Sequence, residues 1–350
     1  MKKIKVCAAC GVPREISGGS RWESDGTISA LRTPGQRSLF YEVEGIDGLF
    51  RNIGEIVGQP VNRIVAEGKR KNTLDFLEGY FSGLMGMLAR TIGRRRIYMT
   101  IADLGATFGY GHFEIMDVKR GEYVKIFGRN IYSLPLLTGD LLATFNFTER
   151  LPASVIVEEK EGGQIITIKQ GEKPEEELSS RLEAVPYAPK PGDIRFEKCA
   201  SCGAPTEMKS WGFDLEAGVI TDNTTGRRMA SMGIDQIDAV LRELQEELGE
   251  EIITVILQAQ RDYTKSDLEA DEMSKGHSYL RHFFALRGMG NLVSYELNGS
   301  RLEASIENAR PPLLVAGIMY GIFELLSAVE GKLEYELLDD GTLEVNVTAV

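Results

Sequence analysis

The sequence contains few of the residues and motifs that identify common enzyme classes. Its 350 residues include only four cysteines, three histidines and two tryptophans. A Walker loop, a G-x-S-x-G motif and a G-x-G-x-x-G motif after a predicted strand are all missing. These absences exclude the usual phosphate-binding, hydrolase and dinucleotide-binding signatures. No catalytic residue is therefore assigned from the sequence.

Long apolar runs and an excess of positive charge are missing as well. No stretch approaches the roughly 18 apolar residues of a membrane helix. The basic start, residues 1–7, is not followed by the apolar segment of a secretory signal. The formal net charge is −12, and an acidic chain does not attract nucleic acid or anionic lipid over its whole surface. We therefore expect a cytoplasmic protein with neither nucleic acid nor a membrane as its partner.

The four cysteines lie in two copies of a C-x-x-C-G-x-P motif, Cys7 and Cys10 in the first copy and Cys199 and Cys202 in the second. This spacing, with glycine after the second cysteine, is typical of a zinc knuckle, and a tetrahedral zinc site needs four ligands. Because each motif supplies two, we expect the motifs to meet about a pseudo-two-fold axis and hold one structural Zn²⁺. A redox dithiol and a rubredoxin-like iron site are the alternatives.

The repeat extends beyond the cysteines and predicts two homologous halves, residues 1–170 and 194–350, joined by a linker at 171–193. Each half is expected to be α+β, with an antiparallel sheet packed against helices and a small zinc-ribbon-like element. Gly-Ile-Asp occurs in both halves, and its aspartate is expected to cap a helix. Arg37, Arg227 and Arg228 lie in equivalent turns, which indicates a structural contact in each half. A monomer with an internal pseudo-two-fold axis and a homodimer both fit this organisation.

The second half ends with an apolar helix that carries a G-x-x-x-G sequence, Gly317 and Gly321, followed by a strand with acidic residues at 331–336. This segment resembles the end of the 4-vinyl reductase, or hydrocarbon-binding, domain family, and the chain looks like a tandem duplication of that domain. In the first half Gly139 stands in the same frame, with Ala143 in place of the second glycine. The resemblance implies a cavity between helices and sheet that accepts an apolar small molecule. It does not imply reductase chemistry, which the family name overstates. The family usually has a cysteine or histidine near the start of this helix and another cysteine before the last strand, and Leu314 and Asp340 stand there instead, which removes a cysteine-based metal or redox site from this region.

The middles of the halves differ most, and the first half is the better candidate for a ligand pocket. Between residues 76 and 88, glycines interrupt an apolar stretch where alanine would favour a helix. Glycine leaves room for a ligand, and methionine gives an adaptable lining; ordinary core packing is the alternative. We expect a strand at 97–102 and place the extra length of the first half at 105–128. The candidate ligand-binding residues are Tyr80, Gly83, Met85, Met87, Met99, Phe108 and His112.

These features together predict a zinc-stabilised protein that binds an apolar or aromatic small molecule, as a sensor, carrier or accessory factor. An enzyme is one alternative, either a thiol oxidoreductase that uses the cysteine pairs or a ligand-modifying enzyme. A structural protein-interaction module, whose cavities are filled by side chains, is the other.

Overall fold

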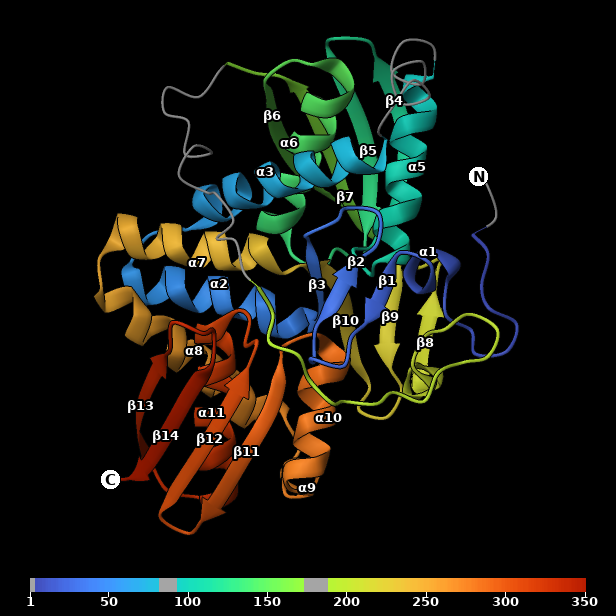
Figure 1. The fold of residues 1–350 in the computed structure, drawn as a ribbon. Coiled ribbons are helices and arrows are strands. Elements are labelled where there is room, and N and C mark those ends of the chain that lie inside the picture. Colours follow the sequence, from blue (N-terminus) through green and yellow to red (C-terminus); the bar gives the residue numbers. More distant parts are fainter. Residues whose placement is uncertain (1–3, 82–92, 173–187) are drawn as a thin grey trace.

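The computed structural model describes residues 4–81, 93–172 and 188–350 (Figure 1). The helices of the first half are α1 (Arg14–Ser17), α2 (Val43–Val57), α3 (Asn62–Tyr80), α5 (Arg94–Thr107) and α6 (Leu134–Glu149). Its strands are β1 (Ser20–Trp22), β2 (Ile28–Ala30), β3 (Arg37–Glu42), β4 (His112–Lys119), β5 (Tyr123–Arg129), β6 (Ala153–Lys160) and β7 (Gly163–Gln170).

The second half has a similar succession of elements. Its helices are η2 (Thr206–Ser210), α7 (Ile234–Leu248), α8 (Glu251–Asp267), α9 (Ala270–Met273), α10 (His277–Arg287) and α11 (Pro312–Ser327). Its strands are β8 (Trp211–Asp214), β9 (Val219–Asp222), β10 (Arg227–Gly233), β11 (Asn291–Asn298), β12 (Arg301–Glu307), β13 (Gly331–Leu337) and β14 (Leu343–Ala349).

Three antiparallel sheets organise these strands. A six-stranded sheet, in the order β1-β2-β3-β10-β9-β8, takes three strands from each half, and its centre is the pairing of Phe40 in β3 with Ser231 in β10. Each half also has a four-stranded sheet of its own, in the orders β4-β5-β7-β6 and β11-β12-β14-β13. Figure 1 shows one of them at the top and the other at the bottom of the molecule. The expectation of mixed α and β structure with antiparallel sheets is confirmed.

Helices from both halves interleave between the sheets. Within each half, α3 packs on α6 and α8 packs on α11, whereas α2 contacts α8 and α3 contacts α7 across the halves. In Figure 1 the long helices α7 and α2 lie one above the other in this middle layer. The buried face of α2 is formed by Ile46, Leu49, Phe50 and Ile53, at helical spacing. The helix ends at Gly58, whose left-handed backbone (φ 75°) glycine adopts readily.

Two local predictions at helix starts are wrong. The residues that precede α2 and α7 are Glu42 and Gly233, and neither makes a side-chain cap. The two Gly-Ile-Asp sequences are therefore out of register by three residues, and Asp47 lies inside α2 rather than capping it. The physical reason is that each central strand passes directly into its helix, without a separate capping turn.

The segment 97–102 is helical rather than extended. It lies inside α5, where Ile97, Tyr98 and Leu104 are buried at intervals that suit a helix. The hairpins β4–β5 and β11–β12 have strands of 8 and 7 residues in both halves. The extra residues of the first half therefore do not lie in that hairpin, and the placement at 105–128 is wrong.

The two halves exchange close backbone contacts in reciprocal pairs. The Gly111 N–H donates to the Gly218 carbonyl (3.0 Å), and the Gly290 N–H donates to the Gly26 carbonyl (3.1 Å). A Cβ on Gly26 would lie 2.3 Å from the Gly290 carbonyl, so this approach requires glycine. The β1–β2 and β8–β9 turns of the six-stranded sheet thus each contact the residues that lead into the four-stranded sheet of the other half.

Two of the three turn arginines make a second reciprocal pair, whereas Arg227 donates to the Asp267 carbonyl within its own half. Arg37 donates to the Asn308 carbonyl (3.2 Å), and Arg228 donates to the Asn130 carbonyl (2.8 Å). Both asparagines have a left-handed backbone, with φ of 59° and 55°.

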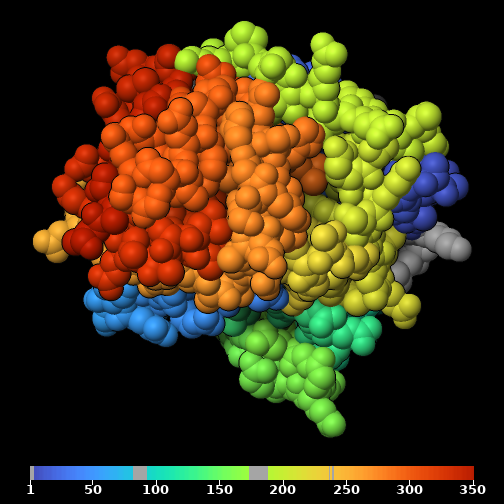
Figure 2. All heavy atoms as spheres, turned by 90° about the horizontal axis from the view of Figure 1, so that it is seen from below, coloured from blue at the N-terminus to red at the C-terminus, as the bar shows by residue number. Residues whose placement is uncertain are grey.

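Figure 2, seen from below, shows the second half as a continuous surface in which the red and orange sheet and helix lie beside the yellow segment around β8 and β9. Among the described residues no helix combines the length and hydropathy needed to cross a bilayer.

Candidate metal centre and ligand cavity

The fold brings the four cysteines together. The sulfur atoms of Cys7, Cys10, Cys199 and Cys202 all lie within 4.8 Å of one another. The Cys7 and Cys199 sulfurs are 3.9 Å apart, and the Cys10 and Cys202 sulfurs are 3.4 Å apart. Tetrahedral zinc, with Zn–S bonds of about 2.3 Å, places its sulfurs about 3.8 Å from one another. The predicted meeting of the two motifs is confirmed, and the arrangement is compatible with a metal site.

Each motif forms a tight turn that directs its two sulfurs to the same side. The Gly11 N–H donates to the Cys7 carbonyl, and the Gly203 N–H donates to the Cys199 carbonyl, both at 2.8 Å. Gly11 and Gly203 have φ of 75° and 79°, in the left-handed region that residues other than glycine adopt only at an energetic cost. The glycine after the second cysteine is therefore required by backbone conformation.

The local electrostatics favour thiolates at part of the cluster. The peptide N–H of Ala9 lowers the pKa of the Cys7 thiol to about 6, and the peptide N–H of Ser201 lowers the pKa of the Cys199 thiol. Burial raises the pKa of the Cys10 thiol to about 12. Four adjacent thiolates would repel one another in a buried place, and a divalent cation would compensate that charge.

The cysteines belong to a small apolar core drawn from both halves. Cys7 is 1% exposed, and the Trp22, Phe40 and Trp211 rings pack in the same cluster. The Phe40 ring stacks on Trp22 (centroids 6.1 Å apart) and meets the edge of Trp211 (5.0 Å). The Trp22 indole N–H donates to the Leu286 carbonyl (2.9 Å). The four cysteines and the centre of the six-stranded sheet thus share one packed unit.

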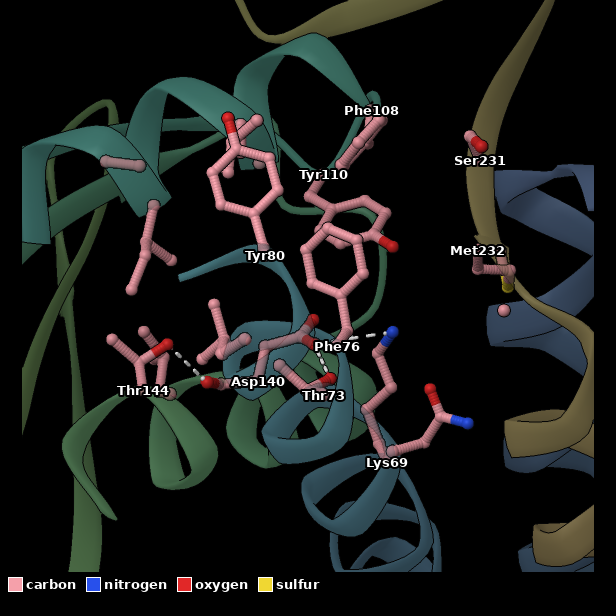
Figure 3. A pocket seen from close by; sticks show the side chains of 18 of the residues that line it. Lys69, Thr73, Phe76, Tyr80, Phe108, Tyr110, Asp140, Thr144, Ser231 and Met232 are labelled. Atoms are coloured by element: carbon pink, nitrogen blue, oxygen red, sulfur yellow. Dashed lines mark hydrogen bonds and ion pairs between the residues drawn. The ribbon is translucent and has the colours of Figure 1, made fainter. Parts of the chain in front are cut away.

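A cavity of about 150 Å³ lies in the first half, between α3, α5, α6 and the sheet β4–β7 (Figure 3). Ser231 and Met232 of β10 close one side, so the second half contributes to its wall. An apolar cavity of this volume accommodates a molecule about the size of benzene. The aromatic side chains of the lining are Phe76, Tyr80, Tyr98, Phe108, Tyr110, Phe113 and Phe145.

The predicted ligand-binding residues are only partly gathered at this cavity. Tyr80 and Phe108 line it. Met99 on α5 and His112 at the start of β4 are not among its lining residues, and the His112 Nε2 atom lies 3.1 Å from Glu114. Three candidates lie outside the described residues: Gly83, Met85 and Met87.

A buried ion pair that was not predicted from the sequence lies in the cavity wall. Lys69 is 2% exposed, and its Nζ atom is 3.3 Å from an Asp140 carboxylate oxygen. The Asp140 carboxylate also accepts hydrogen bonds from the Thr73 hydroxyl (2.6 Å) and the Tyr132 hydroxyl (2.7 Å). Burial lowers the pKa of Lys69, and the neighbouring Asp140 opposes that shift. The Lys69 ammonium also lies 5.1 Å from the centre of the Tyr110 ring.

The only sequence signal for this pair was weak. Lys69 and Thr73 are four residues apart, on one face of α3, and Asp140 follows the glycine at which α6 approaches α3. Lys69 belongs to the Lys-Arg-Lys sequence at 69–71, which is typical of a solvent-exposed helix face. Helix packing, which the sequence does not show directly, turns one member of this run inward.

Comparison with known proteins gives no match, since no family model, no curated protein and no solved structure matches the chain.

Proposed function

We propose that this chain is a zinc-stabilised tandem protein that binds an apolar or aromatic small molecule in its first half, as a sensor, carrier or accessory factor. The observation that carries the proposal is the cavity, whose exposed inner surface is mostly that of aromatic and aliphatic side chains, with polar and charged groups on its α3–α6 and β1–β3 sides. Ligand sites in proteins are concave and mostly apolar, with a small number of polar groups that orient the ligand.

The proposal treats the halves as two copies of one domain, as the resemblance to the hydrocarbon-binding family implies. The equal strand order of the four-stranded sheets and the reciprocal contacts support this view. Corresponding glycines have matching backbones: φ is 81° at Gly109 and 78° at Gly288, and 122° at Gly111 and 121° at Gly290. These matches relate the residues of the two halves position by position.

Lys69 and Gln260 correspond in the same way. A Cβ on Gly139 would lie 2.6 Å from the Lys69 Cβ, and a Cβ on Gly317 would lie 2.6 Å from the Gln260 Cβ. The pair α3 and α6 and the pair α8 and α11 thus each approach closely at a glycine, Gly139 or Gly317. The residues that follow these glycines, Asp140 and Ile318, therefore also correspond.

In the second half, side chains with buried polar partners stand at the positions that correspond to the cavity lining of the first half. Tyr41 and Met232 correspond, because each follows the central residue of its strand. Met232 lines the cavity, whereas Tyr41 is 1% exposed and donates its hydroxyl hydrogen to Gln260. Likewise Arg287 corresponds to Phe108 and forms a buried ion pair with Glu42. We infer that one half binds the ligand and that the other is its structural partner.

Structural zinc is the metal that this site fits best. Four thiolates in a closed tetrahedral set are typical of structural zinc, with no open position for a substrate. Thiol redox catalysis is the second candidate, because the Cys10 and Cys202 sulfurs are 3.4 Å apart and Cys202 is partly exposed. Against it, Cys7 and Cys199 are 1% and 6% exposed, whereas reactive cysteines are accessible.

A cavity-filling substitution tests the ligand site. Met232→Tyr places in the first half the side chain that Tyr41 supplies in the second, and Met232→Leu is the control of similar volume. With ethylbenzene as probe, titrated by calorimetry, we expect one molecule bound per chain in the wild type and in Met232→Leu. We expect at least about tenfold weaker binding in Met232→Tyr, with an unchanged circular dichroism spectrum. Equal affinity in all three proteins would contradict the proposal.

A further inference from the structure

The four-stranded sheet of each half packs against helices on one face and exposes the other. The helix α6 contacts β6 and β7, and α11 contacts β12, β13 and β14. In Figure 1, α6 lies in front of the sheet β4–β7, whereas the sheet β11–β14 lies in front of α11. The exposed face of β4–β7, the first outer face, and that of β11–β14, the second outer face, therefore look to opposite sides of the molecule.

The two outer faces match residue by residue, because the sheets share strand order and register. The sheet β4–β7 has a β-bulge between Ile115 and Asp117. The sheet β11–β14 has one at the same place, between Leu292 and Ser294. Two rows of residues that cross all four strands can therefore be matched. On the first outer face these rows are Asp117, Lys125, Thr167, Ile156 and Lys119, Tyr123, Lys169, Ser154. On the second outer face they are Ser294, Ser305, Glu344, Glu336 and Glu296, Glu303, Asn346, Glu334.

The matched rows carry opposite net charge. The first outer face has three lysines and one aspartate in these rows, which gives +2, and the second has five glutamates without a lysine or arginine, which gives −5. In the two rows that follow, the first outer face adds two acids and two bases, Glu114, Glu158, Arg129 and Lys160. In a chain of net charge −12, the first outer face is therefore a positive surface.

Ion pairs on the two outer faces leave part of this charge uncompensated. Three exposed pairs involve the matched rows: Lys119–Glu122, Arg301–Glu303 and Lys332–Glu334. Within residues 4–81, 93–172 and 188–350, the charged side chains of these rows that form no ion pair are Asp117, Lys125, Lys169, Glu296, Glu336 and Glu344. The remaining charge is thus positive on the first outer face and negative on the second.

The second outer face also contains glutamates that oppose each other. Glu296 is directly opposite Glu303, and Glu336 is directly opposite Glu344. Like charges directly opposite each other destabilise a sheet, and the matching pairs of the first sheet carry no like charges. The fold therefore does not require these pairs. The same face is hollowed, with a depression of about 520 Å³ lined by residues of all four strands. A positively charged surface seated there would offset the repulsion.

We propose that copies of this chain associate head to tail, the first outer face of one chain against the second outer face of the next. Lys125 and Lys169 meet the unpaired glutamates of the neighbouring copy. The complementary surface belongs to the same chain and has the same number of strands, which identifies a second copy as the occupant. Because the two faces differ and look to opposite sides, the contact is heterologous, and association continues beyond a dimer.

The area of the faces sets the strength of this association. Four strands about 4.8 Å apart, each with about seven residues at 3.4 Å, make a face of about 450 Å². Two such faces bury about 900 Å² together, at the low end of specific interfaces. We therefore expect weak and reversible association that depends on ionic strength.

Sedimentation velocity of the zinc-loaded full chain over a range of protein concentrations tests the contact. In about 0.1 M salt, where the Debye length is about 10 Å, the mean mass should rise with concentration past that of two chains. In about 1 M salt, where the Debye length is about 3 Å, the dissociation constant should be at least about tenfold higher.

Charge reversal on either face should prevent self-association. The double variant Lys125→Glu with Lys169→Glu makes the first outer face acidic. The triple variant Glu296→Lys, Glu336→Lys and Glu344→Lys makes the second outer face basic. Each variant alone should stay monomeric. An equimolar mixture should associate again, because the unchanged acidic face of one then meets the unchanged basic face of the other. Recovery in the mixture also shows that both variants are folded.

A control variant separates the faces from total charge. Arg195→Glu with Lys209→Glu changes two exposed residues outside both sheets by the same total charge as the double lysine variant, and it should still associate. A wild type that stays monomeric, a closed dimer, or association that strengthens with salt would overturn the inference. So would self-association of either charge-reversed variant, or a mixture of folded variants that stays monomeric. A monomeric wild type that binds polylysine would assign the second outer face to a basic partner protein instead.

Discussion

Removing the cysteine pair of either half should abolish the bound metal completely rather than halve it. The sulfurs of Cys7 and Cys199, and those of Cys10 and Cys202, meet across the two halves. A site with only two thiolates lacks half of its ligands. Replacing both cysteines of the first motif by serine should therefore have the same effect on metal content as replacing both cysteines of the second.

The size of the effect on stability follows from the length of chain that the metal closes. The linked cysteines are 192 residues apart in sequence. The chain-entropy relation for a cross-link that closes a loop of this length gives about 5 kcal/mol at 25 °C. Domains are stable by about 5–15 kcal/mol in total, so loss of the metal should remove a large part of the free energy of unfolding.

The assay combines metal analysis with urea unfolding of the purified full chain. We expect one zinc per wild-type chain, none in either double-serine variant, and a decrease of about 5 kcal/mol in the free energy of unfolding when a chelator removes the metal. Ser201→Ala, which changes a neighbour of the cluster but no ligand, should keep the zinc. Two zinc ions per chain, or half of the metal retained by one double variant, would refute the shared site. A mass two hydrogens below that of the reduced chain, without zinc, would indicate redox chemistry instead.

Three further substitutions, Gly218→Ala, Tyr41→Phe and Lys190→Met, probe the fold and one ion pair, and the first two each have a matched control. Gly218→Ala should destabilise the protein by about 2–4 kcal/mol in urea unfolding, because its Cβ would lie 2.1 Å from a carbonyl oxygen of the other half; Gly226→Ala, with a similar φ but open space, should cost about 1 kcal/mol. Tyr41→Phe removes the hydrogen bond to the buried Gln260 Oε1 atom and should lower the free energy of unfolding by about 1–3 kcal/mol. Tyr123→Phe, at the surface, should change it by less than about 0.5 kcal/mol. The hydrogen bond from Lys190 lowers the pKa of Asp340 to about 2. The pair therefore stabilises the fold fully above the unfolded pKa of 3.8, and this stabilisation is lost as the pH falls toward 2. A carboxyl titration by NMR should show an Asp340 pKa of about 2 in the wild type, and this pKa should rise toward 3.8 in Lys190→Met.

Some of this structure could be predicted from the sequence because the signals were local or duplicated. The alternation of apolar residues and the Gly-rich turns gave the hairpins that close each half, β6–β7 and β13–β14. Gly58 and Gly249 end their helices, as expected. The two cysteine motifs could be predicted to lie together, because each supplies only two of the four ligands of a tetrahedral metal site.

Other features depended on packing that no local pattern shows. The sequence predicts a strand at 97–102, where the structure has the helix α5, because a short apolar run such as the one around Ile97 and Tyr98 suits either structure. Lys69 and Asp140 are 71 positions apart in sequence and meet only because α3 and α6 approach at Gly139. Three of the seven predicted ligand residues lie outside the described chain, and the cavity is formed largely by residues of α3, α5 and α6 that carried no distinctive motif.

The central strands connect the metal cluster to the cavity. Met232 belongs to the second half but lines the cavity of the first, and Tyr41 belongs to the first half but bonds to Gln260 of the second. Each half therefore closes the interior of the other, and a single half would leave its own interior open on that side. The two strands flank the Phe40–Ser231 pairing, and Phe40 packs in the core that contains the cysteines. A shared metal that fixes the two motifs against this core would also fix the strand that forms one wall of the cavity.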